Sequence, residues 1–192
     1  MAAMFAVAEK GYAATTVADI LRGAKVSRTT FYELFDDKLD CFLAACAMAS
    51  ETVVAEMAAT LDASREIEDP FDRLGLLLEA YLRALSRLPE LARVFLVEVY
   101  AAGEAAIRQR IAMLDRFADL VVGAWGDSGG LLGRGEYQRL AAEMLVGAVS
   151  SKVTNAVAIG EAERLPELHE PMMALVAEMV GAQPTRARGA RH

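Results

Sequence analysis

The sequence contains few of the side chains on which enzymes rely for catalysis. Its two histidines, His169 and His192, lie outside any metal-binding spacing. Residues 126–130 spell Gly-x-Ser-x-Gly, but the turn that presents a nucleophilic serine follows a strand, and no phosphate-binding loop with its lysine is found. The glycines between residues 126 and 135 follow no predicted strand, so they indicate a loop. We therefore expect no cofactor, no metal site and no enzymatic activity; a hydrolase that uses carboxylates alone is the least implausible enzyme.

A different chemistry is present where Arg28, Thr29 and Thr30 follow one another. The guanidinium of an arginine binds two acceptors of guanine at once, and a threonine reaches a base edge or the methyl group of thymine. These residue types are typical of a helix start that reads DNA in the major groove. Whether they serve in this way depends on the helices that position them.

Capping residues predict two short helices before this segment. Residues 1–10 form the first, which Gly11 ends. Thr16 precedes the second, over residues 17–23, and Asp19 three positions later completes a capping box. The carboxylate of Asp19 also suits the positive start of a helix.

A break at residues 24–26 separates the second helix from a third, over residues 28–34, which Ser27 caps. Two short helices around a three-residue turn form a helix-turn-helix, whose second helix enters the major groove. Four apolar residues are predicted to hold these helices together, namely Ile20, Val26, Phe31 and Phe35.

The charge of the chain limits how it binds nucleic acid. The net charge of −7 excludes binding through general basicity, because affinity of that kind scales with the number of phosphates neutralised. Up to Cys46 the chain has six acidic and five basic residues, so this segment is close to neutral. Contacts with DNA must therefore be local.

Residues 11–46 resemble the DNA-binding domain of TetR-type transcriptional regulators. The family pattern appears as Gly11-Tyr12, Thr15-Thr16-Val17, Asp19-Ile20, Val26-Ser27, Thr30-Phe31-Tyr32, Phe35 and Lys38. The family usually has a glycine where this chain has Lys25, and a left-handed residue other than glycine costs about 1 to 2 kcal/mol. Residues 145–149 resemble the small-residue helix that such proteins use at their dimer interface. The resemblance implies an operator-binding, ligand-responsive homodimer.

The residues predicted to bind DNA surround the third helix. Arg28 and Thr29 are assigned to base readout, and the position of Tyr32 commonly contacts phosphate in the family. Lys38 lies in the first turn of a helix, where a cation opposes the helix dipole and needs a partner. A DNA phosphate or the nearby Asp37 is that partner. The complete set is Thr16, Lys25, Ser27, Arg28, Thr29, Thr30, Tyr32 and Lys38.

The remaining chain reads as all-α, because its apolar residues recur at spacings of three and four and no strand pattern is found. Breaks near Asp69-Pro70, at Pro89, at Gly103 and elsewhere predict about nine helices in total. We divide the chain into a DNA-binding domain over residues 1–46, with three helices and the helix-turn-helix, and an effector-binding and dimerisation domain over residues 47–192. No uninterrupted apolar run approaches the roughly 18 residues of a membrane span, so we expect a cytoplasmic protein.

The second domain is predicted to bind a small apolar or aromatic effector. Ligand sites are largely apolar, with few polar groups, and draw on several elements. The candidate residues are Tyr81, Phe95, Tyr100, Met113, Phe117, Trp125 and Met144. Aromatic and methionine side chains at helical spacing are also common in hydrophobic cores, so the alternative is that these residues only fill the core.

The last two long helices, over residues 136–159 and 171–180, are predicted to join two copies of the chain. Small residues on the first of them allow a partner helix to approach closely. The second has an apolar stripe that is too extensive to be left exposed to water. The predicted interface comprises Ala141, Ala148, Ser151, Leu168, Met172, Leu175, Val176 and Met179. The stripes would alternatively pack only against the core of their own chain.

Other features are interpreted more simply. Cys41 and Cys46 point about 140° apart on a helix and are read as buried thiols. The basic tail with Arg186, Arg188 and Arg191 is read as a solvated end. Because the first segment is near neutral, a helical dimer that has lost DNA binding is the alternative to a repressor.

Overall fold

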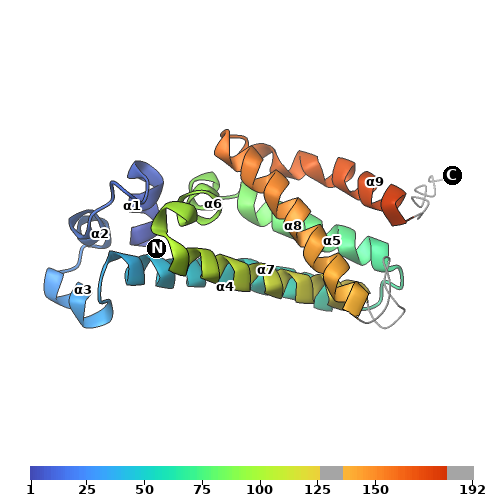
Figure 1. Cartoon of the computed structure of the whole chain (residues 1–192), viewed down its shortest axis with the longest axis horizontal. Coiled ribbons are helices and arrows are strands. Elements are labelled where there is room, and N and C mark those ends of the chain that lie inside the picture. Colours follow the sequence, from blue (N-terminus) through green and yellow to red (C-terminus); the bar gives the residue numbers. More distant parts are fainter. Residues whose placement is uncertain (126–135, 181–192) are drawn as a thin grey trace, which may run out of the picture.

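The computed structural model describes residues 1–125 and 136–180, and in these ranges the chain is all-α, as predicted. The first three helices are α1 (Ala2–Lys10), α2 (Val17–Ala24) and α3 (Arg28–Leu34). They lie at one end of an elongated molecule, with the last described residues near the other end (Figure 1). The predicted loop at residues 126–135 and the basic tail lie outside the described residues.

The remaining helices form the body of the molecule. They are α4 (Lys38–Ala63), α5 (Pro70–Ser86), α6 (Pro89–Leu96), α7 (Glu104–Trp125), α8 (Glu136–Ala158) and α9 (His169–Val180). Two 3-10 segments, η1 (Glu98–Ala102) and η2 (Ala162–Leu168), precede α7 and α9. The prediction for the last helix was wrong at its start: α9 begins at His169, so Pro171 falls in its first turn and Leu168 belongs to η2.

Two hydrophobic cores share the long helix α4. The first core contains Phe42 and Cys46 of α4, and the second contains Val54 and Met57 further along it. Helix α4 is apolar and long enough to cross a membrane by length and composition, yet its buried residues contribute to both cores, as in a core helix. It also runs without a break through residue 46, where the predicted domains meet.

Residues from beyond the predicted first domain complete the first core. Helix α6 contributes Leu91 and Val94, which are buried with Met4 and Val7 of α1. Of the four predicted core residues, Ile20 and Phe31 are buried and Phe35 is half-buried. The prediction for Val26 was wrong, because this residue lies in the turn before α3 and is exposed. The first three helices are thus fixed by α6 as well as by each other.

The turn of the helix-turn-helix keeps left-handed geometry without a glycine. Lys25 ends α2 with φ 56° and ψ 39°, and its amide donates to the carbonyl of Leu21. Lysine adopts this conformation at a cost of about 1 to 2 kcal/mol relative to the right-handed one.

Replacing Lys25 with glycine should therefore stabilise the protein. Removal of the strain outweighs the extra entropy that glycine loses on folding, so the free energy of unfolding should rise by about 0.5 to 1 kcal/mol. Urea denaturation measures it. The adjacent Ala24→Gly variant, at an exposed helical position, is the matched control and should lose up to about 1 kcal/mol. Equal losses in both variants would show that Lys25 is not strained.

Candidate functional site

The amino end of α3 presents polar side chains to solvent. Ser27 caps the helix by accepting a hydrogen bond of 3.0 Å from the Thr30 amide, which confirms the predicted cap. The Ser27 and Thr30 hydroxyls also lie 2.9 Å apart, so Thr30 takes part in the cap. Arg28 and Thr29 are exposed beside them. Only Phe31 of α3 is buried, which leaves the rest of this short helix available to a partner.

Tyr32 and Arg28 occupy one face of α3. The Arg28 guanidinium carbon lies 5.6 Å from the centre of the Tyr32 ring, a cation–π distance. The Tyr32 ring is about half exposed and packs edge-on against Phe31. Arg22 and Lys25 at the end of α2 are also exposed, and Arg22 pairs with Asp19.

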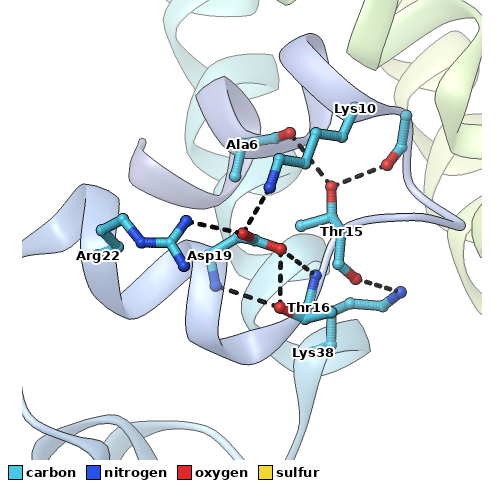
Figure 2. A network of polar contacts seen from close by, with 8 residues as sticks. Ala6, Lys10, Thr15, Thr16, Asp19, Arg22 and Lys38 are labelled. Atoms are coloured by element: carbon cyan, nitrogen blue, oxygen red, sulfur yellow. Dashed lines mark hydrogen bonds and ion pairs between the residues drawn. The ribbon is translucent and has the colours of Figure 1, made fainter.

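A polar network fixes α2 to the end of α1 (Figure 2). Thr16 and Asp19 form the predicted capping box, with Asp19 accepting from the Thr16 amide at 3.0 Å. Asp19 also accepts from the Lys10 ammonium at 2.6 Å and from Arg22 at 3.0 Å. These hydrogen bonds, first that of Lys10 and then those of Thr16, hold the pKa of Asp19 well below its usual range. Asp19 is therefore ionised wherever the helix is formed.

Lys38 has a partner within the protein. Its ammonium donates to the carbonyl of Tyr12 at 2.9 Å and to that of Thr15 at 3.0 Å, and it lies 4.1 Å from the centre of the Tyr12 ring. Asp37, which was considered as its partner, instead caps α4 through the Asp40 amide. Lys38 thus anchors the turn between α1 and α2 to the start of α4. Contact between Lys38 and a phosphate remains a prediction.

Sequence reasoning missed the second anchor of this turn. Glu98 of η1 accepts a hydrogen bond of 3.0 Å from the Tyr12 amide, across 86 positions of sequence. Gly11 has φ 78°, and a Cβ atom there would lie 3.3 Å from the Glu98 carboxylate. No local pattern signals a pairing between a glycine turn and a glutamate so far along the chain.

The second core encloses a small apolar cavity of about 60 Å³. Its wall comes from α4, α5, α7, α8 and α9. Of the seven predicted ligand residues, Tyr81 and Phe117 line it, with ring centres 5.3 Å apart. Phe95, Met113 and Trp125 are buried away from its wall, whereas Tyr100 and Met144 are exposed. The other lining residues are Met57, Leu74, Leu77, Leu78, Val121, Leu145, Val146, Val149, Ser150, Met172, Met173 and Val176.

A buried arginine, missed by sequence reasoning, lies beside this cavity. Arg110 of α7 donates to Ser150 of α8 at 2.8 Å, and Ser150 belongs to the cavity wall. The same guanidinium donates to the Thr154 hydroxyl at 3.1 Å, the Tyr100 hydroxyl at 3.2 Å and the Phe95 carbonyl at 3.5 Å. It therefore connects α8 with the end of α6 and with η1.

Comparison with protein families identifies a match in the first domain. Residues 2–45 match the family described as bacterial regulatory proteins, tetR family. These residues contain the helix-turn-helix and the turn that Lys38 anchors. Over these residues the chain is similar to tetR-family regulators.

Solved structures share the fold of this chain over nearly its whole length. The fatty acid degradation regulator FadR from Bacillus halodurans has a TM-score of 0.77 and 22% identity, covering 95% of this chain and 96% of its own. FadR from Bacillus subtilis, solved in complex with stearoyl-CoA, has a TM-score of 0.76 and 21% identity, with the same coverage.

PfmR from Thermus thermophilus has a TM-score of 0.68 and 20% identity, covering 99% of this chain and 94% of its own. At such identities the likeness shows the fold alone. No curated protein matches the sequence.

The residues predicted for dimerisation fall into two groups. Ala148 and Ser151 of α8 and Leu175 and Met179 of α9 are exposed, and Ala141, Leu168 and Met172 are half-buried. Val176 is buried, and it lines the cavity together with Met172. Met172 and Val176 therefore pack against the core of their own chain, which is the alternative to a place in the dimer interface.

Replacing Lys38 with methionine should destabilise the first domain, because the substitution removes two charge-assisted hydrogen bonds at a half-buried site. The free energy of unfolding should fall by about 2 to 4 kcal/mol. Lys10→Met, which removes a more exposed ion pair with Asp19, is the control and should cost at most about 1 kcal/mol. Thermal or urea unfolding followed by circular dichroism measures both. A Lys38→Met protein as stable as the wild type would refute the anchoring role.

Proposed function

We propose that this chain is a ligand-responsive TetR-family repressor that acts in the cytoplasm and is released from its operator by a small apolar or aromatic effector. The observation that carries the DNA-binding half is the amino end of α3, where Arg28 and Thr29 are exposed and ordered by the Ser27 cap. In this proposal they read base edges, while Tyr32 and Lys38 bind the DNA backbone. Thr16, Lys25, Ser27 and Thr30 complete the contact surface.

The cavity in the second core supports the effector half of the proposal. Its 60 Å³ is well below the several hundred cubic ångströms of an ordinary ligand site, so a ligand must widen it. Three methionines, Met57, Met172 and Met173, lie in its wall, and their flexible side chains adapt to an occupant. The FadR structure from Bacillus subtilis holds stearoyl-CoA, and a ligand with an apolar chain also suits the present cavity.

Widening the cavity provides a route to the DNA-binding surface. Met57 belongs to α4, whose first residue, Lys38, anchors the turn between α1 and α2. A ligand that shifts α4 therefore acts on the helices that hold α3. The ligand weakens DNA binding only as far as it binds the released conformation more tightly than the DNA-binding one. This difference in binding free energy is typically 1 to 3 kcal/mol.

The proposed repressor is a homodimer joined through α8 and α9. A single helix-turn-helix buries too little surface for tight, specific binding, and a two-fold dimer matches two half-sites about one helical turn, or a multiple, apart. The exposed apolar side chains Tyr137, Leu140 and Met144 of α8 and Leu175 and Met179 of α9 are available for this contact. Gly147 and Ala148 beside them are exposed and allow close approach of a partner helix.

Selection of bound sequences from random DNA duplexes at a fixed salt concentration tests DNA recognition. The wild-type protein should select a two-fold symmetric sequence. Arg28→Ala should weaken its binding by about 1 to 3 kcal/mol and relax the sequence preference, because a base contact is lost. Arg65→Ala, which removes an exposed arginine at the far end of α4, should leave both unchanged. Selection of no sequence would favour a helical dimer without DNA binding.

Replacing Ala148 with arginine tests the proposed dimer face. A bulky charge without compensation at a buried interface is strongly unfavourable, so the variant should sediment as a folded monomer at micromolar concentration. The wild type and Glu163→Arg, which alters an exposed residue of η2, should sediment as dimers. A monomeric wild type would exclude the dimer, and a folded dimeric Ala148→Arg protein would place its interface elsewhere.

A further inference from the structure

Arg110 is a buried cation whose described partners are all neutral. The residue is 7% exposed, and its guanidinium bonds to three hydroxyls and one carbonyl. Within residues 1–125 and 136–180, no carboxylate forms an ion pair with it. Arginine keeps its charge in proteins, and a buried charge without a counter-charge is costly.

Several of the more exposed arginines do have carboxylate partners. Arg116 pairs with Glu51, Arg139 with Glu143 and Arg164 with Glu167, although solvent already compensates these charges. The charge that most needs an anion is thus left without one among the described residues, whereas surface charges that need none have partners. This distribution is expected if the counter-charge of Arg110 arrives with a ligand.

A second polar group beside the cavity is the Tyr81 hydroxyl. It is buried and forms no hydrogen bond with any residue in 1–125 or 136–180, and the Tyr81 ring is part of the cavity wall. Burial raises the pKa of Tyr81 to about 12, with the positive charge of Arg110 acting in the opposite direction. Tyr81 is therefore a neutral donor near the guanidinium. An unmade hydrogen bond at a buried hydroxyl costs about 1 to 3 kcal/mol, so this group also favours a polar ligand atom.

We propose that the effector is a monocarboxylate with an apolar chain, its carboxylate bound by Arg110 and Tyr81 beside Ser150 and its chain lying in the apolar cavity. This inference rests on the proposed function and specifies the head group of its ligand. A guanidinium binds a carboxylate through two parallel hydrogen bonds, which matches the planar head group and cancels the buried charge. The three methionines of the cavity wall then accommodate the chain.

The same arginine connects the ligand with the DNA-binding helices. It holds the Phe95 carbonyl at the end of α6 and the Tyr100 hydroxyl in η1, and Glu98 of η1 holds the Tyr12 amide. A carboxylate is a stronger acceptor than these neutral groups, so it draws the guanidinium away from them. The anchor on the turn between α1 and α2 loosens as a result.

Binding of dodecanoate, dodecanol and dodecanoyl-CoA to the full-length protein tests the head group directly. Calorimetry below the micelle concentration gives the affinities, and operator binding is measured in the same solutions. Dodecanoate should bind at least about tenfold more tightly than dodecanol, as expected for a charged hydrogen bond, and more tightly than the thioester. It should also weaken DNA binding. Equal affinity for acid and alcohol would overturn the head-group assignment alone, and binding of neither would also overturn the apolar-ligand proposal.

Arg110→Met separates a ligand-binding role from a structural one. The variant loses four hydrogen bonds, so either role lowers its stability, but only the binding role predicts that the preference for dodecanoate over dodecanol falls to less than about threefold. Arg108→Met, at an exposed residue two positions earlier, should keep the preference. A preference that survives in a folded Arg110→Met protein would contradict the proposal.

Discussion

Tyr12 is bound on both sides of its backbone by residues from distant parts of the chain. Its amide donates to Glu98 of η1, and its carbonyl accepts from Lys38 of α4. The turn at Gly11 and Tyr12 connects α1 with α2, so these two hydrogen bonds place the helix-turn-helix on the rest of the molecule. Helix α6 contributes to the same support by burying Leu91 and Val94 against α1. A movement of α4 or of the segment from α6 to η1 must therefore alter the position of α3.

The C-terminal part of the molecule is suited to produce such a movement. The apolar cavity touches α4 through Met57, and Arg110 touches α6 and η1 through Phe95 and Tyr100. Helix α4 and the segment from α6 to η1, which hold the turn, thus both contact the same region of the second core. Because packed cores have discrete arrangements rather than a continuous range, the proposed ligand would favour one position of α3 over another. The predicted DNA-binding and effector domains would then be two functions of one continuous framework.

Local chemistry made much of this structure predictable from the sequence. The caps of Thr16 and Ser27 and the breaks at Pro70, Pro89 and Gly103 depend on hydrogen bonds and dihedral angles of near neighbours. The family pattern depends on the same local features. Cys41 and Cys46 are buried free thiols, as predicted.

The errors arise where distant residues decide the outcome. The partners of Lys38 within the protein were missed because the carbonyls that it binds are more than twenty positions away. Val26 was placed in a core that α6 in fact completes. Five of the seven predicted ligand residues lie outside the cavity wall. They were chosen as large apolar side chains at helical spacing, and this spacing does not indicate which face of a helix meets a cavity. Arg110 gave no signal, because nothing local distinguishes a buried arginine from the exposed ones around it.

The distance between the two α3 helices of a homodimer tests the coupling most directly. A spin label on Glu33→Cys, an exposed position of α3, reports it by electron–electron double resonance. Cys41 and Cys46 are buried with raised pKa values, that of Cys46 to about 12, so the new thiol is labelled selectively. Selected operator DNA should narrow the distance distribution to one separation, and an apolar ligand that releases DNA should shift it to another. Identical distributions with DNA and with ligand, or no intermolecular distance at all, would contradict the account.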